Sequence, residues 1–450
     1  MKMRKAFGGL ILLLVTSMIM PLYGQLQRAE PRDETIDSKT QAEIIDSVTR
    51  VINEVYVFPD VAEEMAVHVK GMYQKGEYKD ITSLSAFSDR LTKDLRDICH
   101  DRHLGVRYTP DITMDDIRTE EDTVTDEERQ EHFEELSRDN FGFKEIRILP
   151  GNIGYLKFNG FVDAYFGGAT AIAAMNFLAH VDALIIDLRE NGGGSPSMIQ
   201  LISSYFFNDP VHLNSFYIRK EDTTKQFWTA SHVEGPRMAN TPIYILTSGY
   251  TFSAAEEFTY NLKNLERATI VGETTGGGAH PVQGEIFPNL KVSLRVPFGR
   301  AINPITGTNW EGTGVEPHIS CAADHALEVA RVDAMEKLVA KAESEEEKGM
   351  LRWDLDMLKA QLEPVEVPEE LMNKYVGDYG PRKIWMEGDE LYYQRDDRPK
   401  QKLIALSEDI FMIEGVDYFK MKFEEDESGE VIGILGIYKQ GFIDRSPKDK

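Results

Sequence analysis

Cysteine and basic residues are both scarce in this sequence. Cys99 and Cys321 are its two cysteines, and 50 Lys and Arg residues stand against 76 Asp and Glu residues. Two cysteines so far apart are neither a disulfide framework nor a metal site, although an exported chain could pair them. The formal net charge of −26 argues against nucleic acid and anionic membrane surfaces as partners, because both attract basic patches.

Long apolar runs are also rare, and the exception lies at the N-terminus. Residues 1–24 begin with three basic residues, continue as an apolar run from Ala6 to Met20 and end at Gly24. This order is typical of a secretory signal peptide. The run is short for a membrane span, which needs about 20 apolar residues. We therefore expect cleavage after Gly24, export to the periplasm or outside the cell, and no stable membrane insertion; an uncleaved anchor is the alternative.

Hydrophobic periodicity divides the rest of the chain into parts of different character. Apolar residues at helical spacing come first, then strands that alternate with helices, and finally strands separated by tight turns. The middle pattern predicts an α/β core with a sheet covered on both faces, and the last one predicts an antiparallel β-domain. The expected parts are a signal peptide (1–24), a linker (25–39), a helical N-terminal domain (40–109), an acidic connector (110–142), the α/β core (143–322), a helical connector (323–361) and the C-terminal β-domain (362–446).

Three glycine-containing segments follow predicted strands of the core. Because ligands bind outside the carboxyl ends of strands in open α/β sheets, we expect the three to meet there. Their glycines match no phosphate-binding pattern. The simplest explanation of these glycines is that they allow tight turns. The functional alternative is that their exposed backbone N–H groups bind an oxyanion. The segments are DLRENGGGS (187–195), TSGYTFSAAEE (247–257) and GETTGGGAHP (272–281).

Ser253 opens a predicted helix, and Glu256 follows at the spacing of a capping box. The same pattern occurs at Thr125–Glu128 and Ser344–Glu347, in charged helices, where it predicts only caps. Ser253 differs because it follows a buried strand and opens an apolar helix, as a nucleophile elbow does. A serine nucleophile needs a base, and spacing alone does not select one of the ten histidines. No metal or cofactor is expected, since the HDRH pattern at 100–103 lacks further ligands.

Five motifs in order resemble the tail-specific and C-terminal-processing serine proteases, in the branch of tricorn protease and interphotoreceptor retinoid-binding protein. The resemblance spans roughly residues 40–319. It implies a mixed α/β crotonase-like (ClpP-like) protease core and hydrolysis of a peptide or protein substrate without a cofactor. The motifs are DRHLGV (101–106), DLRENGGG (187–194), TSGYTFSAAEEF (247–258), VGETTGGG (271–278) and NWEGTGVEPHI (309–319).

The resemblance also implies roles for individual residues. Ser253 matches the nucleophile and His103 the general base. Glu311 matches a glutamate that supports the hydrogen bonds of the site, directly on His103 or through an intermediary. The N–H groups of Gly193 and Ala254 match the donors that bind the oxyanion.

The sequence departs from the family pattern at two positions. Gly278 stands where the processing proteases have a lysine, 25 residues after the serine, which favours the histidine-based branch. Arg102 replaces the serine that precedes the histidine in tricorn, and the inserted PDZ domain is missing. A catalytically silent ligand- or peptide-binding protein on the same fold is the alternative, although a binder would need none of the three catalytic residue types.

Substrate specificity and oligomeric state remain open. Recognition of a chain end requires a site for a carboxylate. Arg189, Arg295 and Arg300 are candidates because they are basic in an acidic protein, although a salt bridge is the simpler use of each.

Overall fold

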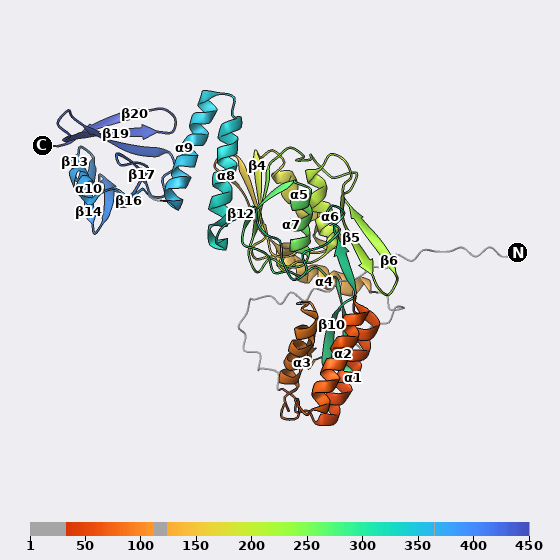
Figure 1. Ribbon diagram of the computed structural model, residues 1–450. Helices are drawn as coiled ribbons and strands as arrows, with labels where there is room; N and C mark the ends of the chain where they lie inside the picture. The colour runs from red at the N-terminus through yellow and green to blue at the C-terminus, as the bar shows by residue number, and fades with distance from the viewer. Residues whose placement is uncertain (1–32, 112–123, 364, 450) are drawn as a thin grey trace. The chain divides into compact units, whose positions relative to one another are not determined.

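The computed structural model of the chain describes residues 33–111, 124–363 and 365–449 (Figure 1). The signal peptide expected at 1–24 lies outside these ranges. Contacts divide the chain into two compact units, one that holds nearly all residues up to Ala323 and one that holds those from Asp324 onward.

Three helices form the N-terminal domain. They are α1 (Ser38–Val55), α2 (Pro59–Gln74) and α3 (Leu84–Cys99). The side chain of Asp37 accepts a hydrogen bond from the N–H of Thr40 and thereby caps α1, and Ser83 caps α3 in the same way. The buried face of α1 carries Ile44, Ile45, Val48, Val51, Ile52 and Val55, the spacing expected of a helix that covers a core.

The described end of the predicted linker is not a free segment. The Asp33 carboxylate accepts a hydrogen bond from the N–H of Ser85 at 3.0 Å. Ile36 is buried in the core of the helices, and its N–H donates to the Thr82 carbonyl at 2.8 Å. The helical domain therefore begins a few residues earlier than the polar composition suggests.

A hairpin from much later in the chain completes the core of the helical domain. Strands β1 (Gly105–Tyr108), β9 (Val282–Phe287) and β10 (Val292–Pro297) form an antiparallel sheet in the order β1-β10-β9. Val292, Leu294 and Val296 are buried among the side chains of α1, α2 and α3, and Figure 1 shows β10 among these helices. The sequence pattern places this segment in the α/β core (143–322), but its alternating apolar residues instead pack in the core of the helical domain.

The central sheet has the strand order β12-β8-β7-β4-β3-β2. β4 pairs in parallel with β7, β7 with β8 and β8 with β12, as the alternation of strands and helices predicted. All five residues of β4 are buried, which suits a central strand. The strands are β2 (Phe143–Leu149), β3 (Ile153–Phe158), β4 (Ala183–Asp187), β7 (Ile243–Thr247), β8 (Ala268–Gly272) and β12 (Ile319–Ser320); the helices of this part are α4 (Asp126–Arg138), α5 (Ala164–Phe177), α6 (Pro196–Ser203) and α7 (Ala254–Asn264).

A further small sheet was not expected from the sequence. Its order is β11-β5-β6, with β5 at His212–Ile218, β6 at Thr223–Trp228 and β11 at Gly299–Ile302. Short 3-10 turns lie at Asn140–Gly142, Ser204–Phe206, Pro288–Leu290 and Ala323–His325.

The second unit contains the two predicted charged helices and the predicted antiparallel β-domain. Its eight strands follow one another in an up-and-down order, and the N–H of Asp449 donates to the Asp378 carbonyl at 2.8 Å, which joins the two ends of the sheet. The elements are α8 (Ala326–Lys341), α9 (Glu345–Leu362), α10 (Glu369–Tyr375), β13 (Gly377–Tyr379), β14 (Arg382–Glu387), β15 (Glu390–Arg395), β16 (Gln401–Ala405), β17 (Ile410–Ile413), β18 (Phe419–Glu425), β19 (Val431–Tyr438) and β20 (Ile443–Pro447). The predicted fold class is thus confirmed.

The structure also shows the two predicted helix caps and the state of the two cysteines. Thr125 and Ser344 are helix caps, and each accepts a hydrogen bond at 3.1 Å from the N–H of the glutamate three residues on. Cys99 and Cys321 are both thiols, and burial raises the pKa of Cys99 to about 11.

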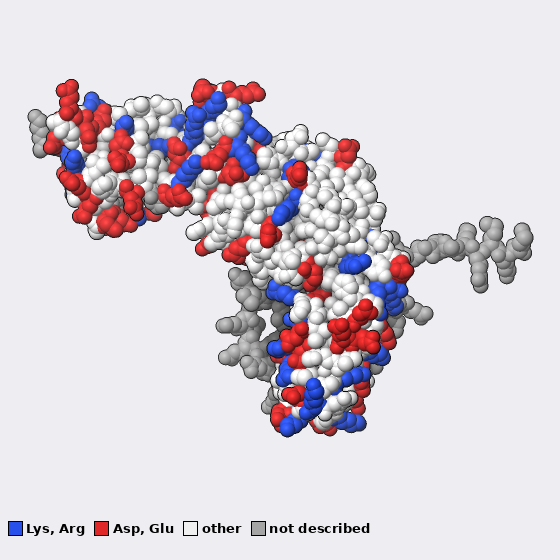
Figure 2. All heavy atoms as spheres, in the orientation of Figure 1, with Lys and Arg blue, Asp and Glu red and all other residues white. Residues whose placement is uncertain are grey.

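The acidic excess is visible on the surface. Acidic and basic side chains are mixed on the face in Figure 2, and acidic ones predominate over the C-terminal β-domain. Within the described ranges, no helix combines the length and apolar character of a membrane span.

Candidate functional site

The three glycine-containing segments meet at the carboxyl ends of their strands, as predicted. Hydrogen bonds join neighbouring segments: the N–H of Phe252 donates to the Asn191 carbonyl at 3.1 Å, and the N–H of Gly276 donates to the Thr251 carbonyl at 2.9 Å. We call these segments the β4 loop (188–195), the β7 loop (248–253) and the β8 loop (273–281).

Ser253 has a backbone conformation that its two sequence analogues lack. Its φ and ψ are 56° and −122°, a region that residues other than glycine rarely adopt. Thr125 and Ser344 are extended instead, with φ of −68° and −102°. A strained turn between a buried strand and a helix is the geometry that presents a nucleophile. The backbone therefore separates Ser253 from an ordinary helix cap.

A buried carboxylate holds the β8 loop against the start of α7. Glu256 is fully buried. Its Oε1 accepts from the Thr275 hydroxyl at 2.5 Å and the Gly277 N–H at 2.7 Å, and its Oε2 accepts from the N–H groups of Gly278 at 2.8 Å and Ser253 at 2.9 Å. Burial raises the pKa of Glu256, and these hydrogen bonds oppose the rise. Glu256 thus connects the backbone of Ser253 to that of Gly278.

His103 packs against Gly278. A Cβ atom at position 278 would lie 2.7 Å from Cε1 of His103 and closer still to the ring of Phe252. The rings of His103 and Phe252 are 4.7 Å apart. The guanidinium of Arg102 lies 5.2 Å from the centre of the Phe252 ring and donates to the Gly276 carbonyl at 2.6 Å. The rings of Phe252 and His103 together therefore occupy the space into which a lysine at position 278 would extend.

The environment of His103 keeps its imidazole neutral. The residue is 4% exposed, and burial lowers its pKa to about 4, although the nearby charge of Asp101 works in the opposite direction. Its Nδ1 lies 3.8 Å from Oδ1 of Asp101, which also accepts the His103 backbone N–H at 2.9 Å. A neutral imidazole can accept a proton at neutral pH.

Glu311 reaches His103 through two residues that the sequence analysis did not select. Nδ1 of His280 lies 2.6 Å from Oδ2 of Asp101 and 3.5 Å from Oε2 of Glu311. Oε2 of Glu311 also accepts the N–H groups of Ala279 at 2.6 Å and His280 at 3.2 Å. Burial and the charge of Asp101 raise the pKa of Glu311. The contacts run in the order His103, Asp101, His280, Glu311, and a carboxylate oxygen of Glu311 also lies within 4.8 Å of a ring nitrogen of His103.

Asp101 and His280 each carried a weak signal in the sequence. Asp101 is part of DRHLGV, and His280 lies two residues after the glycine run of the β8 loop. Neither could be paired with the other from sequence, because 179 positions separate them.

The same group could hold a metal ion on geometric grounds. Asp101, His103 and Glu311 each offer a donor atom, and these atoms lie within 4.8 Å of one another. Nδ1 of His103 and Oε1 of Glu311 are buried and have no hydrogen-bond partner within the described part of the chain. Since Asp101 and Glu311 already contact His280, their arrangement equally suits orientation of the imidazole.

Gly193, whose N–H is predicted to bind the oxyanion, also allows the β4 loop to approach Ser253 closely. Its φ is 107°, and a Cβ atom there would lie 2.7 Å from Cβ of Ser253 and 2.9 Å from the nitrogen of Ala254. Only glycine permits this approach of the β4 loop. Its N–H donates at 2.9 Å to Oδ1 of Asn191, which is fully buried. The N–H of Ala254 belongs to the first turn of α7, where backbone donors have no partner in the helix.

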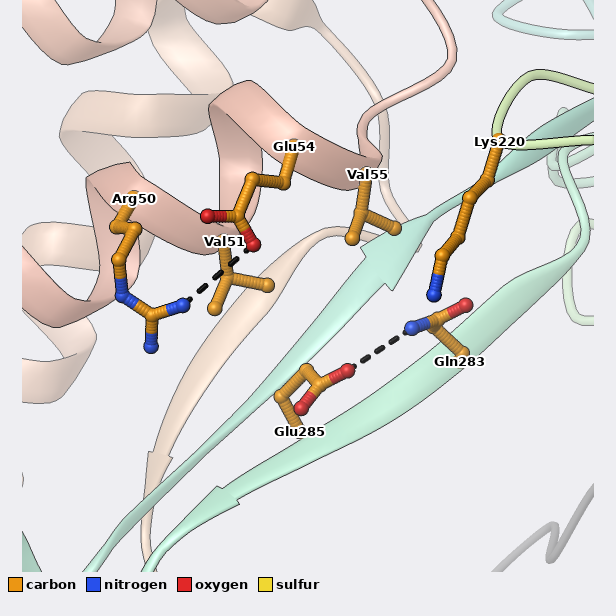
Figure 3. A pocket seen from close by; sticks show the side chains of 7 residues that line it. All are labelled: Arg50, Val51, Glu54, Val55, Lys220, Gln283 and Glu285. Atoms are coloured by element: carbon orange, nitrogen blue, oxygen red, sulfur yellow. Dashed lines mark hydrogen bonds and ion pairs between the residues drawn. The ribbon is translucent and has the colours of Figure 1, made fainter. Parts of the chain in front are cut away.

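A pocket of about 390 Å³ lies elsewhere on this unit, between α1 and β9 (Figure 3). The side chains of Gln283 and Glu285 are hydrogen-bonded at 2.9 Å in its wall. No residue of the candidate site lines it, so we assign it no part in the chemistry. Its lining residues are Arg50, Val51, Glu54, Val55, Lys220, Gln283 and Glu285.

Comparison with known sequences finds two family models that each match part of the chain. Residues 152–321 match peptidase family S41, and residues 38–142 match the N-terminal domain of Peptidase_S41 in eukaryotic IRBP. A carboxy-terminal-processing protease of Bartonella bacilliformis is 29% identical over 189 residues, which cover 41% of this chain and 42% of that protein. The chain thus spans less than half the length of this curated relative.

Solved structures show more distant likenesses. A putative peptidase from Parabacteroides merdae is 18% identical, with 68% of this chain and all of that chain covered and a TM-score of 0.47. Mature CPAF is 14% identical, with 70% and 98% covered and a TM-score of 0.48. Tricorn protease is 13% identical, with 65% and 35% covered and a TM-score of 0.40.

We predict that His103 titrates far below an ordinary histidine. In the folded protein, its ring proton signals should shift with a midpoint near pH 4, against 6.5 for an unperturbed histidine, because burial disfavours the imidazolium. NMR of the wild type and of His103→Gln, which lacks the signal, measures this midpoint. The urea-unfolded chain is the control, and a folded-state midpoint near 6.5 would contradict the burial argument.

Proposed function

We propose, from the match of residues 152–321 to peptidase family S41, that this chain is a serine-type peptidase that hydrolyses peptide bonds in a peptide or protein. The observation that carries the proposal is the strained conformation of Ser253 at the start of α7, with the buried His103 across Gly278. The family match supports the reaction type, and the geometry supports the choice of residues.

His103 serves as the general base in this proposal. The imidazole takes the proton of the Ser253 hydroxyl as Oγ attacks the peptide carbonyl, and later gives that proton to the leaving amine. Water then hydrolyses the acyl-enzyme by the same route in reverse. Asp101 orients the imidazole from the Nδ1 side and stabilises its protonated form, and the contact with His280 and Glu311 fixes Asp101.

The oxyanion binds at the N-terminus of α7. The N–H of Ala254 supplies one donor, aided by the partial positive charge at a helix start. The N–H of Gly193 supplies the second donor once it leaves Oδ1 of Asn191, its acceptor in the present structure. Substrate binding must therefore rearrange the β4 loop slightly before the acylation step.

Labelling with a fluorophosphonate probe tests the nucleophile. We expect the folded wild type to be labelled and Ser253→Ala to be unlabelled, because Ser253 is the activated hydroxyl. Ser344→Ala is the matched control: Ser344 begins the same S-x-x-E pattern but only caps α9, so this variant should label like the wild type.

The labelling result also separates the peptidase from a silent binding protein on the same fold. Folded wild type that takes up no probe, or probe uptake that survives Ser253→Ala, would overturn the proposed mechanism.

The order of contacts from His103 to Glu311 predicts a graded loss of activity. Asp101→Asn should lower kcat by about 10²- to 10⁴-fold, since it acts on the imidazole itself. Glu311→Gln should lower kcat by about 10- to 100-fold, since it acts through His280 and Asp101. The double variant should be no slower than Asp101→Asn alone.

Steady-state kinetics on a cleaved peptide measures these effects. Glu316→Gln is the control, because Glu316 is an exposed acid in the same segment. Losses that multiply in the double variant would show that Glu311 acts independently of Asp101.

Export is the remaining part of the proposal, and it rests on the pattern of residues 1–24. Protein recovered from the producing cells should begin at Gln25. N-terminal sequencing checks this, and a chain that begins at Met1 would contradict cleavage.

A further inference from the structure

Three side chains from distant parts of the sequence surround one small space beside the imidazole of His103. Asp101, His103 and Glu311 each offer one donor atom, and these atoms lie within 4.8 Å of one another. Nδ1 of His103 is 3.8 Å from Oδ1 of Asp101, which is too long for a hydrogen bond. Within residues 33–111, 124–363 and 365–449, this is the one group in which three histidine, cysteine or carboxylate donors meet in this way.

Two of the donor atoms have no partner in the described part of the chain. Nδ1 of His103 and Oε1 of Glu311 are both buried and make no hydrogen bond there. Because His103 is only 4% exposed, bulk solvent does not satisfy its ring nitrogen. Buried polar atoms without a partner destabilise a protein, and an ion is one of the groups that can satisfy them.

His280 holds the two carboxylates in place through their other oxygens. Its Nδ1 lies 2.6 Å from Oδ2 of Asp101 and 3.5 Å from Oε2 of Glu311. The backbone N–H groups of Ala279 and His280 also donate to Oε2 of Glu311. Oδ1 of Asp101 and Oε1 of Glu311 remain available to an ion. Carboxylates that bind metals are typically oriented by such neighbouring hydrogen bonds.

The donor set selects a class of ion. One imidazole nitrogen and two carboxylate oxygens suit Zn²⁺ and similar divalent transition metals, whereas Mg²⁺ and Ca²⁺ prefer oxygen ligands alone. Around a tetrahedral zinc ion, donor atoms lie about 3.4 Å from one another. The three side chains therefore have to close slightly around the ion.

An ion on Nδ1 would change the proton distribution of the His103 ring. A metal-bound neutral imidazole keeps its single ring proton on the other nitrogen, which here is Nε2. In the mechanism proposed above, Nε2 takes the proton of Ser253, and it cannot accept a proton while it already carries one. A bound ion would thus remove the general base without contacting Ser253.

We propose that Asp101, His103 and Glu311 form a binding site for a divalent transition-metal ion such as Zn²⁺, and that the bound ion reversibly inhibits the peptidase. The inhibition rests on the proposed function above, whereas the binding of the ion does not. His103 is the second histidine of the HDRH pattern at 100–103. The ligands that this pattern lacked in the sequence are Asp101, from within it, and Glu311, from much later in the chain.

Isothermal titration calorimetry with ZnCl₂ at pH 8 tests the binding. The wild type, treated with EDTA and dialysed, should bind one Zn²⁺ ion at a site that Mg²⁺ and Ca²⁺ do not occupy. Asp101→Asn and Glu311→Gln should each weaken this binding at least about 10-fold, because each removes a charged ligand. Circular dichroism confirms that both variants are folded.

His132→Gln is the matched control for the calorimetry. Nδ1 of His132 also lies 3.8 Å from a carboxylate oxygen, that of Glu135. Among the described residues, however, no third donor joins this pair. The variant should therefore bind Zn²⁺ as tightly as the wild type does.

The rate of fluorophosphonate labelling tests the inhibition. Saturating Zn²⁺ should slow the labelling of the wild type at least about 10-fold, since the general base is lost, and excess EDTA should restore the rate. His132→Gln should respond like the wild type. Glu311→Gln should need at least about 10-fold more Zn²⁺ for the same relative slowing, because its affinity for the ion is lower.

Three results would overturn the proposal: no binding of Zn²⁺ by the wild type, binding that is unchanged in both ligand variants, or an unchanged labelling rate at saturating Zn²⁺. Each can occur while Ser253 is labelled normally without metal. If the wild type is not labelled even after EDTA treatment, the peptidase mechanism and the inhibition both fail, and the calorimetry alone decides whether the ion site exists.

Discussion

The buried carboxylate of Glu256 is the interaction on which the site depends. One oxygen accepts the N–H groups of Ser253 and Gly278, and the other accepts the Thr275 hydroxyl and the N–H of Gly277. The Glu256 side chain therefore holds both the strained turn before α7 and the glycine run of the β8 loop. Because a buried carboxylate without its donors is costly, neither segment can move far without the other.

The second constraint is the space left by Gly278. His103 comes from the helical domain, and it meets the α/β core where a side chain at position 278 would otherwise lie. β1, which begins just after His103, pairs with β10, and β10 fills the core of the helical domain. This pairing fixes the position of His103. β9, which pairs with β10, begins two residues after His280. The contacts that connect His103 to Glu311 thus depend on the β9–β10 hairpin. This hairpin packs with the helical domain, although it comes much later in the sequence than the three helices.

The sequence predicted local features well because local physics determines them. ALIIDL became the buried β4, and Thr125 and Ser344 became caps, since apolar runs and capping side chains act over a few residues. The meeting of the three loops followed from the parallel order of their strands.

Features that depend on distant contacts could not be predicted in the same way. The alternation in VSLRV fixed which face of β10 is apolar, but not which core that face would fill. Asp101 and His280 are 179 positions apart, so neither could be recognised as the partner of the other. The acceptor of the Gly193 N–H depends on the side-chain conformation of Asn191, which no pattern of glycines specifies.

The structure of the protein after reaction with a fluorophosphonate tests the central claim most directly. The account predicts phosphorus bonded to Oγ of Ser253, its oxygen within hydrogen-bonding distance of the Ala254 N–H, and the imidazole of His103 still packed on Gly278 with Nε2 toward the adduct. An adduct on another residue, or a His103 ring turned away from the modified serine, would contradict it.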